Sequence, residues 1–312
     1  MKKIICLLLC IVLLASCSTN EPEIETPTPE PEPTEIIDAE PEISLPSLTV
    51  EQLPVIDGST ANIPLAEALV ALMLNIPRSD AAELINFNGT NDSYINLMYD
   101  WSECSLIISY EPPPSVVEEA EMYNFEWELA PIGRDALVFI VNESNPVQNI
   151  TTEEARAIYT GEITNWSELG GNDVDIEPFQ RNETSGSQTL FIKLVMGDTP
   201  PMEPDIKYLS GGMGLLIESV ASYNNTGAAI GFSVYFYAQN MNPNDGLKFL
   251  SIDGVAPTRE TIQNGEYPHV NDFYAGIAAS APADSVERQI LNWLQSEEGR
   301  MLIEHEGYAL IN

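Results

Sequence analysis

The chain is predicted to fold as an α/β protein with parallel-rich sheets flanked by helices on both faces. Strand-length apolar runs, such as residues 105–110 and 135–142, alternate with segments whose apolar residues recur at helical spacing. The folded part spans about 265 residues, which is enough for a large core divided between two lobes. We find no internal repeat in the sequence.

Residues 1–17 form a targeting segment. Two lysines precede an apolar run over residues 4–14, and small residues lead into Cys17. The segment resembles a bacterial lipoprotein signal, in which cleavage before Cys17 leaves that cysteine to carry the lipid. The alternative is an ordinary secretory peptide followed by a chance cysteine. No later run is long enough to span a bilayer, so the lipid would be the anchor, on the outer face of the cytoplasmic membrane.

The cysteines predict a fold without disulfides. Of the four in the chain, Cys6 and Cys10 leave with the signal segment. With Cys17 acylated, Cys104 has no partner in the chain, so the fold must be stable without a disulfide even in an oxidising compartment.

Residues 18–48 are predicted to be an acidic, proline-rich tether. Glu, Pro and Thr dominate this segment, and it carries almost no aromatic side chain. Like charges and prolines keep such a chain extended, and it buries too little apolar surface to fold. We therefore expect it to hold the folded domain away from the membrane.

The net charge limits the classes of partner. The chain has 12 basic and 48 acidic residues and a formal net charge of −36. Such a surface repels nucleic acid and anionic lipid. A small anion would have to be held by local dipoles and a well-placed arginine.

The first part of the folded domain contains two small polar turns that precede helices. Thr60 can cap a helix over residues 66–76, and the turn at residues 88–93 precedes a second helix. The strand at residues 105–110 ends at Glu111, at the strand end where open α/β sheets place ligands. The alternative for Glu111 is a solvated loop acid in a very acidic chain.

The rest of the chain continues the alternation. The strand 135–142 is followed by a helix capped at Thr151 or Thr152 and by a turn with a buried Trp166. The later predicted elements are a strand at residues 175–179, a helix at 215–223, a strand at 228–235 and a helical tail at 283–308.

The stretch at residues 179–189 predicts an anion-binding cradle. Arg181 precedes a turn in which Ser185 can cap a helix and Gly186 lets a ligand approach the backbone. The first N–H groups of a helix lack internal partners and lie at the positive end of its dipole, so an oxyanion can accept their hydrogen bonds. Arg181 adds a fork of donors that matches phosphate, sulfate or carboxylate oxygens. The alternative is a surface turn with a solvated arginine.

Several motifs together resemble the phosphate-binding lipoproteins of bacterial phosphate ABC importers. They are Arg181-x-Glu183-x-Ser185-Gly186-Ser187, Asp57-Gly58-Ser59-Thr60, Ala136-Leu137-Val138 with Asn142 and Asn145-Pro146, Ile163-Thr164-Asn165-Trp166, Ala229-Ile230-Gly231-Phe232 and Ser296-Glu297-Glu298-Gly299. The resemblance covers nearly the whole chain after the tether. It implies a two-lobed type II periplasmic-binding-protein fold with a ligand cleft, in which residues 49–136 and 268–312 form lobe 1 and residues 137–267 form lobe 2.

The resemblance also implies a function. The chain would be a monomeric extracytoplasmic protein, without cofactor or metal, that captures inorganic phosphate and passes it to the permease subunits of an ABC transporter. The implied site consists of Thr60, the Ala61 amide, Thr90, Glu111, Arg181, Glu183, Ser185, Gly186 and Ser187. The alternatives are a binding protein for another oxyanion, a phosphate sensor and a surface adhesion module.

The chain departs from the family pattern around this site. Family members usually carry Asp where Glu111 stands, and often where Glu183 stands, so both acids are one methylene longer here. Thr-Phe is frequent where this chain has Thr60-Ala61, and Ser187 replaces a common Thr. These differences change the size of the pocket and leave the identity of the anion open.

Glu111 suggests how phosphate could be distinguished from sulfate. Monohydrogen phosphate can donate its proton to a carboxylate, whereas sulfate would set two acceptors against each other in a desolvated pocket. We therefore expect Glu111 to reject sulfate and Glu183 to orient Arg181.

An enzyme is the other class to consider. His269 and His305 are the only histidines, and neither lies near a serine in a Gly-x-Ser-x-Gly pattern. The acids Glu111 and Glu183 could suggest a glycosidase, and no Cys or His spacing supports a metal site. We expect a binding protein that is not an enzyme.

Overall fold

The computed structural model describes residues 44–222 and 227–311. The chain divides after Glu42, and the described residues belong to the unit that follows. The predicted signal segment, with Cys17, and residues 18–43 of the predicted tether lie outside the described residues.

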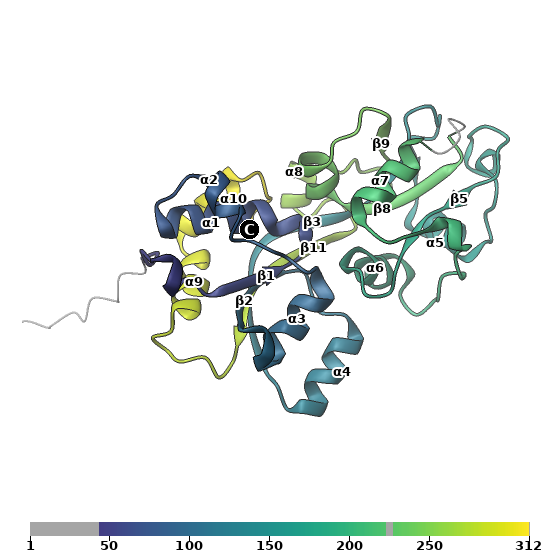
Figure 1. Cartoon of the computed structure of the whole chain (residues 1–312). Coiled ribbons are helices and arrows are strands. Elements are labelled where there is room, and N and C mark those ends of the chain that lie inside the picture. The colour runs from purple at the N-terminus through teal and green to yellow at the C-terminus, as the bar shows by residue number, and fades with distance from the viewer. Residues whose placement is uncertain (1–43, 223–226, 312) are drawn as a thin grey trace, which may run out of the picture. The chain divides into compact units, whose positions relative to one another are not determined.

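A seven-stranded mixed sheet organises the described residues (Figure 1). Its order is β1-β2-β11-β3-β8-β5, and β9 also pairs with β3. The strands are β1 Val55–Gly58, β2 Cys104–Ser109, β3 Trp127–Asn142, β5 Glu177–Pro178, β8 Ala229–Val234, β9 Leu247–Phe249 and β11 Val270–Ala278. The pairs β1/β2 and β5/β8 are parallel, and the others are antiparallel.

The long strand β3 is shared by two halves of this sheet. Its residues from Trp127 to Ala136 pair with β11, whereas those from Leu137 to Asn142 pair with β8 and β9. We call β1, β2, β11 and the start of β3 the first half, and β5, β8, β9 and the end of β3 the second half. Burial along β3 changes close to this point, from partial alternation to an unbroken buried run from Asp135 through Val141. An unbroken apolar run is typical of a strand covered on both faces.

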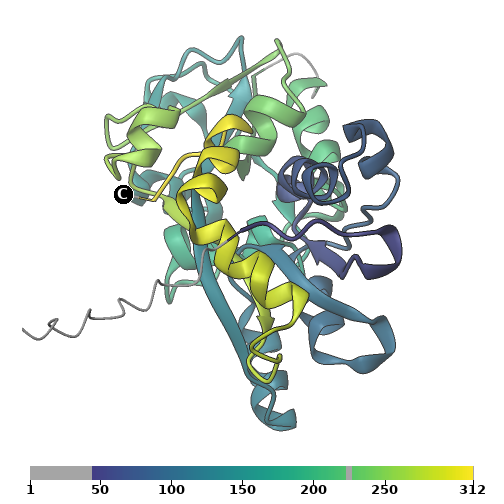
Figure 2. The same ribbon diagram turned by 90° about the vertical axis from the view of Figure 1, so that its left-hand side faces the viewer.

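Helices cover each half of the sheet. In the first half, α3 (Thr90–Met98) packs on β1 and β2, and α9 (Val286–Gln295) packs on β3 and β11. Figure 2 shows the C-terminal helices α9 and α10 (Glu297–His305), in yellow, beside the long strand β3. In the second half, α6 (Gly186–Phe191) and α7 (Met213–Ser222) pack on β8.

The remaining elements are two short strand pairs and the other helices. Two further strand pairs are parallel, β4 with β10 and β6 with β7. Their bounds, with those of the other helices, are β4 Asn149–Ile150, β6 Gln180–Arg181, β7 Leu209–Ser210, β10 Ser251–Ile252, α1 Ile63–Leu74, α2 Arg78–Ala82, α4 Pro114–Tyr123, α5 Thr152–Thr160 and α8 Arg259–Gln263. The 3-10 helices are η1 Val50–Gln52, η2 Thr60–Asn62, η3 Asp100–Ser102, η4 Trp166–Leu169 and η6 Ile206–Tyr208, and the π-helices are η5 Ile192–Met196 and η7 Tyr237–Met241.

An aromatic cluster holds α6 against the second half of the sheet. Phe191 of α6 stacks on Phe232 of β8, with ring centroids 4.4 Å apart, and Tyr159 lies 4.6 Å from Phe191. All three side chains are buried. Removing one such ring from a core costs about 3–5 kcal/mol of stability, so the cluster sets the position of the α6 N-terminus firmly.

Most predicted elements are present, with some shifted ends. Thr151 caps α5 by accepting from the Glu154 amide at 3.1 Å, and Trp166 is buried with its Nε1 donating to the Ala228 carbonyl at 2.9 Å, as predicted. The predicted single tail helix is wrong. The tail divides into α9 and α10, because Ser296 begins a new helix by accepting from the Gly299 amide at 3.2 Å.

A buried carboxylate lies where β3 changes partners. Asp135 accepts hydrogen bonds from the Tyr110 hydroxyl at 2.7 Å, the Ala136 amide at 2.8 Å and the Phe236 amide at 3.1 Å. Tyr110 follows β2 in the first half, whereas Phe236 follows β8 in the second. Burial raises the pKa of Asp135 to about 6, although these donors and the Tyr235 backbone oppose that rise. Asp135 therefore links the two halves at their junction.

Candidate functional site

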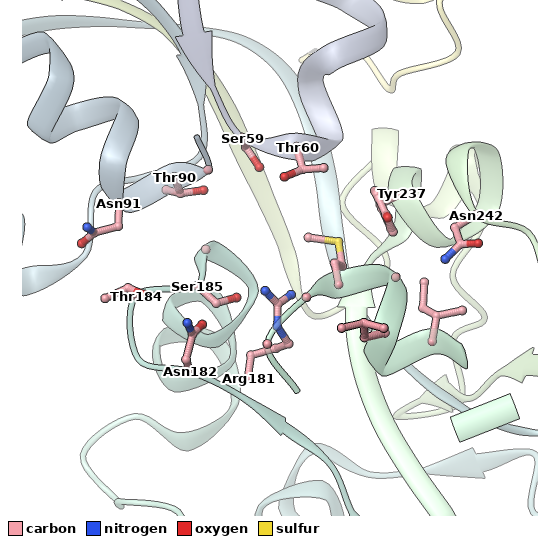
Figure 3. A pocket seen from close by; sticks show the side chains of 18 of the residues that line it. Ser59, Thr60, Thr90, Asn91, Arg181, Asn182, Thr184, Ser185, Tyr237 and Asn242 are labelled. Carbon is pink, nitrogen blue, oxygen red and sulfur yellow. The ribbon is translucent and has the colours of Figure 1, made fainter. Parts of the chain in front are cut away.

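A pocket of about 860 Å³ lies between the two halves of the described unit (Figure 3). The first half contributes Ser59 and Thr60 and residues 88–92 before and in α3. The second half contributes Arg181 and the turn that follows it, the start of α7, and the side chains of Tyr237 and Asn242. Segments from distant parts of the chain therefore form one cavity, which is where most ligand sites lie.

Arg181 is the cation of this pocket. Its guanidinium donates from Nε to the Ser210 carbonyl at 3.2 Å and from Nη1 to Ser187 Oγ at 3.5 Å. None of the ion pairs among the described residues involves Arg181. Burial lowers its pKa to about 10, while the nearby Tyr237 opposes that change. A partly buried cation without a carboxylate partner is costly, and a bound anion would offset that cost.

Beside Arg181, a helix begins at Gly186 as predicted, but Ser185 does not cap it with its side chain. Ser185 occupies the N-cap position, but its hydroxyl lies 3.0 Å from the Ser187 hydroxyl and makes no bond to the helix backbone. Both hydroxyls are buried, so they can turn toward a ligand without giving up a helix cap. Gly186 faces Thr90 of the first half, and a Cβ at Gly186 would lie 2.3 Å from Thr90 Oγ1. Only glycine allows the two walls to approach this closely.

A buried carboxylate fixes the side of the pocket that the first half contributes. Asp57 at the end of β1 accepts from the amides of Gly58 and Asn88 at 2.7 Å each, and from the side-chain amides of Asn88 at 2.8 Å and Asn96 at 2.7 Å. These bonds tie the strand end to the loop before α3, and so to Thr90. The hydroxyl-bearing turn and the helix start are thereby held together.

The Thr60 turn is fixed from the other side by the C-terminal segment. Thr60 begins the 3-10 turn η2 and does not cap α1, which starts at Ile63. The Tyr308 hydroxyl donates to the Ala61 carbonyl at 2.7 Å. The Tyr308 ring stacks on Phe236 with centroids 3.6 Å apart, so both halves meet at this turn.

Five of the nine predicted residues line the pocket, namely Thr60, Thr90, Arg181, Ser185 and Gly186. Ser187 lies directly behind them as a partner of Arg181 and Ser185. Ala61 is buried in the adjoining turn.

The other two predicted residues, Glu111 and Glu183, line a second pocket, of about 1440 Å³, to which Arg181 also contributes. Glu111 forms an ion pair with Lys193 and accepts from the Tyr274 hydroxyl at 3.2 Å. Glu183 is exposed. The ligand role of both acids stays a prediction.

Tyr237 and Asn242 line the first pocket but were not predicted from the sequence. Tyr237 begins the π-helix η7, and Asn242 directly follows it. No local motif marks either residue, because only the packing of η7 against the Thr60 turn brings them to the pocket. A weak signal existed for the start of α7, whose Gly211-Gly212-Met213-Gly214 turn indicates a helix start.

Between residues 44 and 222 and between 227 and 311, no group of three or more His, Cys, Asp or Glu could hold a metal ion. His269 lies away from the pocket, with Nε2 3.0 Å from Thr152 Oγ1, and burial lowers its pKa to about 4. Over the same residues, no helix is both long enough and apolar enough to cross a membrane.

Residues 118–298, more than half of the chain, match the family model of the PBP superfamily domain. The chain therefore belongs to the PBP superfamily. The phosphate-binding protein PstS of Bacillus subtilis (strain 168) is 30% identical over 169 residues, which cover 54% of this chain and 52% of that protein. PstS of Borreliella burgdorferi is 28% identical over 179 residues, which cover 56% of this chain and 62% of that protein. The match thus spans less than two thirds of the length of these relatives.

Solved structures share the fold. One is a phosphate ABC transporter substrate-binding protein from Clostridium perfringens, with a TM-score of 0.64, 24% identity and coverage of 82% of this chain and 98% of that one. Another is an ABC-type phosphate transport receptor from Vibrio cholerae, with a TM-score of 0.60, 21% identity and the same coverage. The two-lobed α/β type II periplasmic-binding-protein fold predicted from the sequence is confirmed. The sheet itself is more antiparallel than predicted, because the shared strand β3 pairs antiparallel with all of its neighbours.

Proposed function

We propose that this chain is the extracytoplasmic solute-binding protein of a phosphate ABC importer. It captures inorganic phosphate in the pocket between its halves and delivers the ion to the permease subunits. The names of the PstS relatives support the choice of phosphate, and the chemistry of the pocket agrees with it. We propose no catalytic role and no cofactor.

The observation that carries the proposal is the unpaired Arg181. Its guanidinium points toward the wall with Ser59 and Thr60, with Ser185 beside it (Figure 3). Phosphate oxygens would accept from the guanidinium, from hydroxyls of both walls and from the amides at the start of α6. A donor-rich site binds an anion strongly once closure of the lobes excludes water, since each bond then acts in a low dielectric.

The full proposed ligand set is the one that the sequence predicts. It consists of Thr60, the Ala61 amide, Thr90, Glu111, Arg181, Glu183, Ser185, Gly186 and Ser187. Glu111 and Glu183 can take part only if their side chains move from the second pocket, so their roles need a separate test.

We propose that the halves of the sheet belong to two lobes that close on the ion. Residues 49–136 and 268–312 form lobe 1, and residues 137–267 form lobe 2. The change of pairing partner between Ala136 and Leu137 of β3 supports this division. Closure around a bound ligand is the usual motion of periplasmic binding proteins.

We further propose that the protein is a monomer held at the outer face of the cytoplasmic membrane by a lipid on Cys17. Replacing Cys17 by Ala should then release the chain from the membrane fraction or leave it unprocessed. A processed Cys17→Ala variant that stays in the membrane without acyl label would contradict the anchor.

Calorimetric titration of the full chain with phosphate, sulfate, molybdate and methylphosphonate tests the function. We expect one tight site for phosphate and at least 100-fold weaker sulfate binding. Tight binding of another anion instead would support the other-oxyanion alternative. An absence of tight sites for all four would favour an adhesion module. A sensor would bind phosphate equally well, so uptake of labelled phosphate by cells with and without the protein separates transport from sensing.

A further inference from the structure

Residues 79–133 contain no basic side chain. This stretch carries eleven Asp and Glu residues and no Lys, Arg or His. It includes α3, η3, β2 and α4, all in the first half. The ion pairs among the described residues involve only two of its acids, Glu111 and Glu128. Most of the negative charge of this stretch therefore has no cation beside it.

Three aromatic rings of the same stretch form a continuous surface. The ring centroid of Tyr99, which follows α3, lies 6.5 Å from that of Trp101 in η3 and 5.4 Å from that of Tyr123 at the end of α4. Trp101 is 71% exposed, Tyr123 is 61% exposed, and the adjoining Met122 is 74% exposed. We call these four residues the aromatic patch. The helices that carry it, α3 and α4, contact each other in the first half (Figure 1).

The aromatic patch is separate from the site already described, since none of its four residues lines either pocket. Large apolar side chains that gather on an exposed surface mark a place of interaction more often than single exposed ones do. Aromatic residues are also the type most enriched at binding surfaces.

Carboxylates lie close to the aromatic patch. The Tyr99 hydroxyl donates to Glu119 Oε1 at 2.7 Å, so one carboxylate is fixed beside the rings. Glu103 and Glu121 are exposed and stand within two positions of a patch residue in the chain. The face of an aromatic ring attracts cations, and Trp does so most strongly. Rings and carboxylates together therefore favour a positively charged partner.

Charge also argues against the other occupants. A second copy of the chain would set the same carboxylates against these, and the predicted tether, residues 18–48, is acidic as well. Anionic lipid is repelled for the same reason. Among the described residues, no group of three or more His, Cys, Asp or Glu could hold a metal ion. An arginine side chain suits the surface, because its planar guanidinium stacks on an aromatic face and bonds to a carboxylate with the same group.

We propose that the aromatic patch is the docking site for an arginine-rich segment of another polypeptide. Guanidinium groups of that segment stack on the exposed rings of Trp101 and Tyr123, and the carboxylates of Glu103, Glu119 and Glu121 accept their N–H groups. This inference does not rest on the proposed function, because the patch and the phosphate pocket share no residue.

Titration of the full chain with three capped hexapeptides at physiological ionic strength tests the inference. The peptides are hexa-arginine, hexalysine and hexaglutamine. We expect hexa-arginine to bind at least threefold more tightly than hexalysine, because a guanidinium stacks on aromatic rings better than an ammonium does. We expect hexaglutamine not to bind. Equal binding of the two basic peptides would mean that net charge alone attracts them and would overturn the inference, as would no binding of either.

Two matched pairs of variants locate the docking site. Trp101→Ala removes no charge and should weaken hexa-arginine about fivefold, the effect of one cation–π contact. Its control is Met301→Ala, which removes an exposed apolar side chain from α10. Glu121→Gln should weaken the peptide at least twofold more than Glu153→Gln, which removes an exposed charge from α5 in the second half. Urea unfolding checks that each variant is folded. Wild-type affinity for hexa-arginine in Trp101→Ala would show that the peptide does not bind at the patch.

Two further measurements address the other occupants. Sedimentation equilibrium of the wild type and of Trp101→Ala reports self-association, and we expect both to be monomers. A dimer that Trp101→Ala abolishes would make a second copy the occupant and overturn the inference. Titration with a tetramer of N-acetylglucosamine probes a neutral sugar chain, and we expect no binding. Binding of this sugar that depends on Trp101, without binding of hexa-arginine, would also overturn the inference.

Discussion

Arg181 and the turn that follows it line both pockets, but the charged groups of the two pockets differ in whether they have a partner of opposite charge. In the first pocket, the Arg181 guanidinium is partly buried and bonds only to a carbonyl and a hydroxyl. In the second pocket, the charge of Glu111 is met by Lys193 and by the Tyr274 hydroxyl. The side chains of Glu111 and Lys193 are 33% and 51% exposed, so water screens that pair as well.

The comparison shows which charge is available to a ligand. An exposed ion pair contributes about 0–1 kcal/mol and is already neutral, so it has little to offer an ion. A partly buried cation without a counter-ion gains much from an anion, because the anion replaces the water that the guanidinium lost on folding. The volume of the second pocket is the larger of the two, but the first pocket is the better anion site.

The largest expected effect is a loss of phosphate affinity, and it distinguishes Arg181 from Lys193. Arg181→Ala should weaken phosphate binding by about 2–5 kcal/mol, because the buried ion would lose a charge-assisted pair of hydrogen bonds. Lys193→Ala should weaken it less than threefold. Calorimetry measures both affinities, and urea unfolding checks that each variant is folded.

Arg300→Ala is the matched control for Arg181→Ala. Arg300 also donates to a backbone carbonyl, that of Ile311, and lies outside the pocket. A variant lacking Arg181 that binds phosphate within threefold of wild type would show that the unpaired cation is not the anion site.

The second expected effect concerns Asp135, a buried charge that has donors but no cation. Its pKa is about 6 in the folded protein and about 4 in the unfolded chain, so the folded state holds the proton more tightly. The stability from this group is present below pH 4 and is lost as the pH rises toward 6 and above. Asp135→Asn removes the charge and keeps one oxygen that can accept from the two backbone amides, while its NH2 group can donate to the Tyr110 hydroxyl oxygen. Its stability relative to wild type should therefore rise by about 2–4 kcal/mol between pH 4 and pH 7.

Urea unfolding at several pH values measures this difference. Asp80→Asn is the control, because Asp80 lies on the surface. If the two variants follow the same pH dependence, burial does not perturb Asp135 at the junction.

A third expected effect tests the approach of the two walls beside Arg181. Gly186→Ala puts a Cβ 2.3 Å from Thr90 Oγ1, so the walls must separate. Overpacking of this kind costs about 1–3 kcal/mol, which we expect to appear as weaker phosphate binding. Thr90→Ala in the same chain should not restore full affinity, because the hydroxyl is also proposed to bind the ion. Wild-type affinity in Gly186→Ala would mean that binding does not need the close approach.

The smallest expected effect on phosphate affinity is that of Glu111→Gln. We expect this variant to weaken phosphate binding only modestly. If Glu111 of the wild type moves away from Lys193 and accepts a hydrogen bond from the phosphate proton, the variant should also improve sulfate binding relative to phosphate at least tenfold. Titration with both anions at neutral pH measures the ratio. An unchanged ratio would leave Glu111 as the partner of Lys193 alone.

Short stretches of sequence were sufficient to predict the elements that carry the candidate site residues. Arg181, Ser185 and Gly186 lie within one short stretch, where a helix start depends on the backbone preferences of neighbouring residues. The sequence left Thr151 and Thr152 open as the cap of α5, and Thr151 is the cap; Trp166 is buried as predicted. The prediction of one helix for the tail was wrong at Ser296, where a capping residue divides two helices that each have an apolar face.

The sequence by itself determined the class of fold and singled out Arg181 as the candidate cation of an anion site, because periodicity, capping and the scarcity of positive charge are visible along the chain. Only the tertiary structure decided which side chains surround that cation. Tyr237 and Asn242 reach the pocket through a π-helix that packs against a turn far away in sequence, and Lys193 pairs with Glu111 across 82 positions. Such contacts depend on how the two halves pack along β3, and no short stretch of residues encodes that packing.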